Sequence, residues 1–230
     1  MRIGAVVQAR MSSRRLPGKV LRKLHGRPML QYLLERLERC RTLDEVVVAT
    51  TTDPSDDQLA EYCGRVGVLC HRGPRDNVAE RLRQAGQRLA LDAFVRVCGD
   101  SPLLDGRLID RAVDLFRRDQ FDVVTNVMPR SFPAGQSVEV VRSTTLADAV
   151  GHMSDQVDLE HVTRFFYRNS NRYRIHNFSS ELDHDDVSFA VDTSCDFDHI
   201  AALIAAMTEP QWQYGVNDLL RLRRACLVQT

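Results

Sequence analysis

A chain of 230 residues is long enough to bury one substantial hydrophobic core, and 43% hydrophobic with 27% charged residues is an ordinary globular composition. Its net charge is zero, yet residues 1–41 carry eleven Lys and Arg against two Asp and Glu, a local balance of +9. A long nucleic-acid track would make the whole domain basic, so a local excess excludes that class and favours a small polyanion.

The cysteine pattern and the first residues of the sequence indicate in which cellular compartment the protein is expected. The six cysteines form no C-x-x-C pair and no paired spacing, and the first two residues run directly into a short apolar strand rather than a signal peptide. No stretch approaches the roughly 18 apolar residues of a membrane-spanning helix. The sequence therefore predicts a cytoplasmic protein with free thiols and with no membrane or nucleic-acid partner.

The first predicted element is a strand over residues 3–7. Its short, unalternated and β-branched apolar run is typical of a strand buried on both faces of a parallel sheet. The loop that follows, residues 8–19, contains four cations and two serines and ends in a Pro-Gly turn. Loops at the carboxyl ends of such strands bind ligands, so this one predicts a site for a nucleotide polyphosphate. The alternative is a solvated basic loop.

This opening loop is not a glycine-rich phosphate loop, because neither G-x-x-x-x-G-K-[ST] nor G-x-G-x-x-G occurs in it. Side chains must therefore make most of the anion contacts. Arg10, Arg15 and Lys19 can neutralise phosphate oxygens, and Ser12 and Ser13 can donate hydrogen bonds to them.

Strands and helices then alternate as far as residue 127, which predicts right-handed βαβ units. The expected helices cover 28–41, about 57–65, 78–90 and 105–118. The expected strands cover 46–50, 67–70, 93–98 and 122–127, with a short extended piece over 20–24.

The second half is less regular, and we interpret 129–185 as an elaboration on the main sheet within one domain of residues 1–230. It should contain strands over 137–141 and 173–178 and helices over 144–152 and 158–167. A strand over 187–191 is expected to return to the main sheet. Helices over 196–207 and 216–226 complete the chain.

Two aspartates follow predicted buried strands: Asp100 comes after 93–98 and Asp192 after 187–191. Both should face the crevice of the opening loop, and Mg²⁺ is often held by one or two carboxylates plus substrate phosphates. The sequence therefore predicts a magnesium site at Asp100 and Asp192, as metal-assisted transfer at phosphorus requires. Asp100 could equally be a turn or capping residue, and Asp196 is better explained as a helix cap.

Glu139 and His161 are candidates for binding a polar organic substrate. A lone histidine on a helix has a structural or interface role by default, and the acidic run 183–186 is by default a solvated loop.

Several motifs together resemble a known family. A-R-x-x-S-x-R-L-P-G-K over 9–19 resembles the signature of the cytidylyltransferases that activate sugar acids, the CMP-sialic acid and CMP-Kdo synthetases. G-D-x-P-L over 99–103, E-H-V-T over 160–163 and V-D-T-x-x-D over 191–196 follow in that family's order. F-P-x-G over 132–135 with Val138-Glu139 is most similar to the SpsF-type branch of polysaccharide synthesis.

The resemblance implies a three-layer αβα nucleotide-diphospho-sugar transferase fold (GT-A or Rossmann-like) with a mostly parallel mixed sheet and an inserted subdomain. It implies a nucleotidyltransferase that transfers CMP from CTP to a sugar, here a sugar acid, with Mg²⁺ as cofactor and release of pyrophosphate. The product would serve surface polysaccharide or glycoconjugate synthesis. A homodimer is also implied, with 129–185 supplying sugar contacts or the dimer interface.

The resemblance also assigns roles. The catalytic residues would be Arg10, Arg15, Lys19 and Asp100, and the metal ligands Asp100 and Asp192. Nucleotide binding would involve Ala9, Arg10, Ser12, Ser13, Arg15, Lys19 and Gly99, with Arg72, Asp76 and Asn77 lining the cytidine pocket. Glu139 and His161 would bind the sugar substrate, while Arg130, His161 and Arg164 could meet its carboxylate or pack between subunits.

Two other functions stay open. One is a nucleotidyltransferase of the same fold that uses UTP, GTP or ATP, although such relatives tend to present a glycine-rich first loop where this chain has Ala9-Arg10. The other is a nucleotide-binding module without catalysis, against which the presence of both Asp100 and Asp192 argues.

Overall fold

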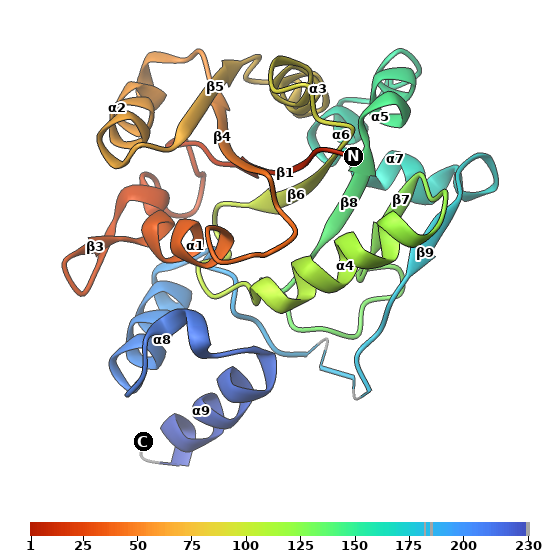
Figure 1. Cartoon of the computed structure of the whole chain (residues 1–230). Helices are drawn as coiled ribbons and strands as arrows, with labels where there is room; N and C mark the ends of the chain where they lie inside the picture. The colour runs from red at the N-terminus through yellow and green to blue at the C-terminus, as the bar shows by residue number, and fades with distance from the viewer. Residues whose placement is uncertain (182, 185, 229–230) are drawn as a thin grey trace.

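The computed structural model describes the whole chain except residues 182, 185, 229 and 230, and for 227 and 228 it describes the backbone alone. Seven strands form one sheet in the order β5-β4-β1-β6-β8-β7-β9 (Figure 1). Within it β8 pairs antiparallel with both neighbours and the other pairs are parallel. The strands are β1 (Ile3–Gln8), β4 (Glu45–Thr51), β5 (Leu69–Gly73), β6 (Ala93–Cys98), β7 (Val123–Thr125), β8 (Glu139–Arg142) and β9 (Ile175–Asn177).

Side chains of the central strands alternate between two hydrophobic cores. In β1, Ile3, Ala5 and Val7 face one core while Val6 faces the other, which confirms a strand buried on both faces. The first core is covered by α1 (Met29–Leu37), α2 (Asp57–Val66), α4 (Gly106–Arg118), α8 (Ser194–Ala205) and α9 (Val216–Val228). The second is covered by α3 (Val78–Arg88), α5 (Ser143–Val150) and α7 (Thr163–Arg168). The predicted three layers are confirmed.

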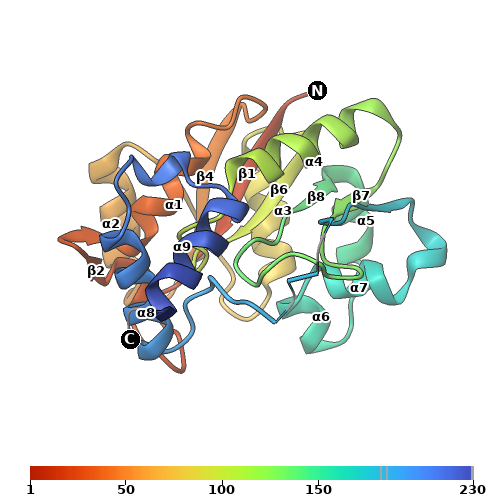
Figure 2. The same ribbon diagram turned by 90° about the horizontal axis from the view of Figure 1, so that it is seen from below.

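Shorter elements complete the chain: β2 (Lys23–Leu24) pairs with β3 (Arg27–Pro28), α6 (Gln156–Glu160) precedes α7, and 3-10 turns lie at η1 (Lys19–Leu21), η2 (Pro54–Asp56), η3 (Ser170–Arg172) and η4 (Gln211–Gln213). In Figure 2, α8 and α9 lie beside α1 at one end of the molecule, and α5, α6 and α7 lie at the other. No helix in the described part of the chain has both the length and the apolar character needed to cross a membrane.

The expectation that 187–191 returns to the main sheet as a strand is wrong. This segment is extended, but it makes one isolated bridge, from Ser188 to Ala134, and its Val191 N–H donates to Asp100 O at 2.9 Å. The physical reason is that both sides of β6 are already occupied, by β1 and β8, so no strand edge is free there. The segment instead crosses the carboxyl ends of the strands.

The single helix expected over 158–167 is also wrong, because it breaks into α6 and α7. His161 leaves the helical region with φ −106° and ψ 61°, and the chain restarts at Thr163. The buried Asp158 carboxylate accepts from Arg164 and lies 3.3 Å from the Arg168 guanidinium, which fastens the two short helices together. The break leaves Glu160 and His161 at a corner instead of on a continuous helix face.

Candidate active site

The opening loop is held by a buried carboxylate. Asp56, fully buried at the start of α2, accepts from Met11 N–H at 2.6 Å and from Thr51 N–H at 3.1 Å. This links the loop after β1 to the end of β4. Gly18, with φ of 71°, then turns the chain into η1, where Lys19 points back to the strand ends.

Lys19 brings the two predicted metal ligands together. Its Nζ lies 3.1 Å from Asp100 Oδ2, 3.1 Å from Asp192 Oδ1 and 2.6 Å from Val191 O, and its side chain is only 9% exposed. Arg15 adds a second cation, with Nη2 2.9 Å from Asp192 Oδ1. Residues 81 and 173 positions away from Lys19 in the sequence therefore share one ammonium group.

The donor set at this point fits a divalent metal that also needs phosphate ligands. Among the residues that the structure describes, no group of three or more His, Cys, Asp and Glu side chains could hold a metal alone. Asp100 and Asp192 supply two carboxylates that bind the same ammonium, so they lie close together. One or two carboxylates plus substrate phosphates is how proteins usually hold Mg²⁺.

These groups line a cleft with two lobes that share the side chains of Arg96, Cys98, Asp100, His161 and Asp192. The loop-side lobe, of about 440 Å³, is otherwise lined by Gln8, Ala9, Arg10, Ser13, Arg14, Arg15, Lys19, Val20 and Glu160. The insert-side lobe, of about 370 Å³, is otherwise lined by Ser101, Val127, Arg130, Gly135, Ser137, Glu139, Thr163, Arg164, Tyr167 and Ala190.

Helix α6 borders the loop-side lobe. Arg10 Nη2 lies 3.1 Å from Glu160 Oε1, and Gln156 Nε2 donates to Asp76 O at 2.5 Å. Ser12 and Asp76 line a smaller hollow of about 130 Å³ next to these contacts. The predicted residues Ser12 and Asp76 therefore lie beside the cleft rather than in its wall.

A buried ion pair forms the floor of the insert-side lobe. Arg96 Nη1 lies 2.6 Å from Glu139 Oε2, with the two side chains 12% and 6% exposed, and Tyr167 donates to Glu139 Oε1. Burial alone would lower the pKa of the Arg96 guanidinium, but the charge and hydrogen bond of Glu139 contribute to raising it overall. Burial and Glu139 together raise the pKa of Tyr167, and burial raises the pKa of Cys98 to about 11. Arg96 is thus charged while Tyr167 and Cys98 are neutral at pH 7.

Three predicted nucleotide-binding residues do not line either lobe of the cleft. Arg72 donates to Thr51 O and lies 2.7 Å from Asp57 Oδ1. Asn77 caps α3 by accepting from Glu80 N–H at 2.8 Å. Gly99 packs against Ala9, where an added Cβ would lie 2.9 Å from the Ala9 Cβ. The role of Gly99 in the structure is the close approach of β1 and β6.

Sequence reasoning did not select Arg14, Arg96 or Tyr167 as site residues, although all three line the cleft. Arg96 carried a usable signal, since it is the one charged residue inside the buried run 93–98. Nothing in the sequence distinguishes Arg14 from the basic residues next to it, so only the position of its side chain in the structure identifies it as a cleft residue. Tyr167 reaches the site through the break after α6, which no local pattern indicates.

Comparisons with known proteins agree with this geometry. The sequence profile of the cytidylyltransferase family matches residues 5–216. The spore coat polysaccharide biosynthesis protein SpsF of Bacillus subtilis is 30% identical over 206 residues, which cover 86% of this chain and 84% of SpsF.

Solved structures share the fold. A cytidylyltransferase from Leptospira borgpetersenii superposes with a TM-score of 0.94 at 27% identity, covering 99% of this chain and 96% of that one. CMP:2-keto-3-deoxy-manno-octonic acid synthetase, solved with CTP, gives a TM-score of 0.71 at 19% identity and covers 89% and 99%. The fold is therefore the predicted nucleotide-diphospho-sugar transferase fold. The chain belongs to the cytidylyltransferase family and is a nucleotidyltransferase.

Proposed function

We propose that this protein transfers CMP from CTP to a hydroxyl group of a sugar acid and releases pyrophosphate, with Mg²⁺ as its cofactor. The observation that carries the proposal is the convergence of Asp100 and Asp192 on Lys19 at the strand ends, beside Arg10 and Arg15. Carboxylates for a metal and cations for a triphosphate are the parts that phosphoryl transfer needs.

The chemistry is in-line attack of the sugar hydroxyl on the α-phosphorus: a new P–O bond forms, the bond to pyrophosphate breaks, and the hydroxyl proton is lost to solvent. Arg10, Arg15 and Lys19 offset the charge of the triphosphate, and Ser13 donates a hydrogen bond to it. Asp100 and Asp192 would hold the metal, which supplies further neutralisation of the pyrophosphate leaving group. The protein thus contributes positioning and charge, and forms no covalent intermediate.

The insert-side lobe supports an acidic acceptor. Arg130 lines this lobe and donates to Ser137 Oγ at 3.0 Å. Arg164 is paired with Asp155 and Asp158. His161 adds an imidazole to the same wall. A guanidinium group suits a planar carboxylate.

A nucleotide panel tests the donor. With Mg²⁺ present, CTP should raise the melting temperature more than UTP, GTP or ATP, because a ligand at 100 times its Kd stabilises the native state by about 2.7 kcal/mol. A pyrophosphate-release screen with CTP and a set of ulosonic acids then identifies the acceptor. Equal stabilisation by all four nucleotides, or release with neutral sugars only, would contradict the proposal. The homodimer and the cytoplasmic location stay predictions.

A further inference from the structure

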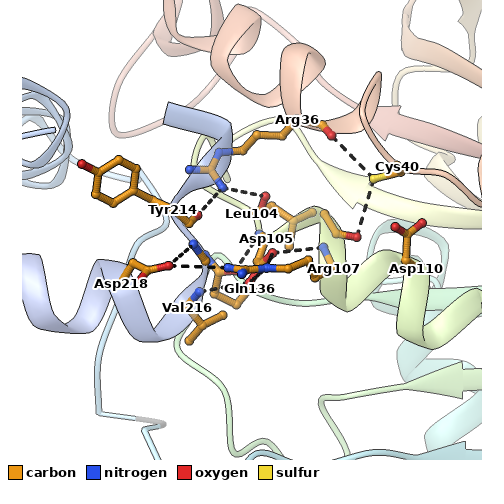
Figure 3. Close-up of polar contacts among 12 residues, drawn as sticks. Arg36, Cys40, Leu104, Asp105, Arg107, Asp110, Gln136, Tyr214, Val216 and Asp218 are labelled. Carbon is orange, nitrogen blue, oxygen red and sulfur yellow. Dashed lines mark hydrogen bonds and ion pairs between the residues drawn. The ribbon is translucent and has the colours of Figure 1, made fainter. Parts of the chain in front are cut away.

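A polar cluster around Arg36, Asp105 and Gln136 lies at the end of the loop that carries Asp100 (Figure 3). The loop runs from Gly99 to Asp105, between β6 and α4, and residues 101–105 are all buried. Groups from three distant parts of the chain meet it there: α1, the segment around Gln136, and residues 211–216. We call these contacts the loop clamp.

Arg36 is the cation of the clamp. It is 2% exposed in α1 and donates to Leu104 O at 3.4 Å, to Tyr214 O at 2.9 Å and to Gln211 Oε1 at 2.6 Å. Burial lowers the pKa of Arg36 to about 10, against the opposing effect of Asp105, so the guanidinium is charged at neutral pH. The buried, charged Arg36 guanidinium thus donates hydrogen bonds to neutral oxygen acceptors of the 99–105 loop and of the C-terminal segment.

Asp105 and Gln136 hold the end of the same loop. Asp105 N–H donates to Gln136 Oε1 at 2.9 Å, and Gln136 Nε2 donates to Leu103 O at 2.8 Å. The Asp105 carboxylate accepts from Arg107 N–H at 3.0 Å and from Val216 N–H at 3.1 Å. Three successive residues, 103–105, are therefore fixed by hydrogen bonds to groups outside the loop.

The start of the loop is fixed at the cleft. Gly99 N–H donates to Gln8 O at 2.9 Å, and Asp100 O accepts from Val191 N–H, next to Asp192. Only Ser101 and Pro102 separate Asp100 from the clamped residues, so a shift of the clamp would move the Asp100 carboxylate relative to Lys19 and Asp192.

We propose that Arg36, Asp105 and Gln136 are positioning residues, which fix the 99–105 loop so that the Asp100 carboxylate is preorganised beside Asp192. Apolar packing would join these elements as stably as buried polar groups do, whereas a satisfied polar network also specifies one geometry. The proposal rests on the proposed function where it concerns metal and nucleotide.

The test compares Asp105→Asn and Gln136→Leu with Asp110→Asn. Asp110 is a matched control because it lies on α4 and accepts from Thr42 N–H at 3.0 Å and Thr42 Oγ1 at 2.7 Å, but does not contact the loop. Hydrogen–deuterium exchange of peptides covering 99–105 is measured on the full chain without ligand. Mn²⁺ affinity in the presence of CTP is measured by electron paramagnetic resonance.

Both clamp variants should speed exchange in 99–105 and weaken Mn²⁺ binding about tenfold, the usual loss when groups behind a metal ligand are removed. The control should lose stability alone. Unchanged exchange in 99–105 would overturn the clamp. Faster exchange in variants that keep the wild-type Mn²⁺ affinity would show that the loop clamp is structural only and would overturn its role in positioning Asp100. If the wild-type protein itself binds no Mn²⁺ in the presence of CTP while the variants exchange faster, the loop clamp is supported and the proposed function is overturned. Should one variant fail to fold, the other decides.

Discussion

At the scale of single residues, the Lys19 ammonium is paired with the carboxylates of Asp100 and Asp192, and a bound triphosphate would change these pairings. One ammonium lies between two carboxylates and is almost completely buried. A metal ion that binds Asp100 and Asp192 would therefore have to share these carboxylates with Lys19.

Lys19→Ala should lower the rate of pyrophosphate release by two orders of magnitude or more, because removing one charge donor at a transferring phosphoryl group costs on the order of 10²–10³ in kcat. Lys23→Ala is the matched control, since Lys23 is exposed in β2 and lies outside the cleft. Steady-state release assays on both variants measure the difference. Turnover of the Lys19 variant at the rate of the Lys23 variant would remove Lys19 from the catalytic set.

Glu139→Gln should cost about 3 kcal/mol of unfolding free energy, because it leaves Arg96 buried without its countercharge. Glu160→Gln breaks a half-exposed pair with Arg10 and should cost less than about 1 kcal/mol. Urea denaturation of the two variants tests the contrast. Similar midpoints would show that the Glu139 pair is not a structural element and would leave substrate binding as its role.

At the scale of elements, the segment that carries Asp192 is held by a close backbone approach. Gly135 has φ of 84°, and an added Cβ would lie 2.6 Å from Ala190 N and from the Phe189 carbonyl carbon. Since these are backbone atoms, they cannot turn aside as a flexible side chain would. The approach sets where the extended segment crosses the strand ends.

Gly135→Ala should therefore destabilise the protein by about 2 kcal/mol or more, from strain at positive φ together with the clash. Gly64→Ala is the opposite case, since its Cβ in α2 would meet nothing within 4 Å, and alanine favours a helix over glycine by up to about 1 kcal/mol. Thermal unfolding of both variants should show shifts of opposite sign. A Gly135 variant with the wild-type melting temperature would refute the close approach.

The start of α8 gives a pH-dependent prediction. Thr193 and Asp196 form a capping box, and although burial opposes ionisation, hydrogen bonds from Thr193 and Asp192 lower the pKa of Asp196 overall. A carboxyl group whose pKa is lower in the folded state stabilises the fold above its unfolded pKa, and this stability is lost as pH falls through the folded pKa.

Asp196→Ala should therefore cost about 1 kcal/mol at pH 7, and the difference from wild type should shrink below pH 4. Asp198→Ala is the control, because Asp198 is exposed on the same helix outside the cap. Denaturant titrations at several pH values measure both. A cost for the Asp196 variant that is constant from pH 7 to pH 3 would contradict the ionised cap.

At the scale of the whole molecule, the two halves of the sequence share one sheet. Strands β7, β8 and β9 continue the sheet built by β1, β4, β5 and β6, and Arg36 links α1 to the C-terminal segment. These contacts support the prediction that residues 1–230 form one domain.

The chain should then unfold in a single transition, because neither half can lose its structure without exposing a sheet edge and a shared core. Trp212, with Arg39 3.6 Å above its ring, reports on the C-terminal segment, while far-UV circular dichroism reports on all helices and strands. The two signals should have the same midpoint in urea. Separate midpoints would divide the chain into two domains.

The sequence by itself determined much of this protein. The buried strand after Arg2 and the alternation of strands and helices to residue 127 follow from apolar runs that end in polar residues, and Asp100 was selected because it follows one of these runs. Such patterns are local, because a strand buried on both faces has few alternatives and its carboxyl end lies at the ligand edge.

Only the tertiary structure decided the rest. The antiparallel insertion of β8 excludes 187–191 from the sheet, the pairing of Arg96 with Glu139 joins residues 43 positions apart, and the predicted nucleotide contact Arg72 pairs with Asp57. Each outcome depends on which distant group occupies a strand edge or pairs with a charged side chain in the folded protein. The spacing of residues along the sequence does not predict these contacts, because the free energy of each contact depends on its partner in the tertiary structure.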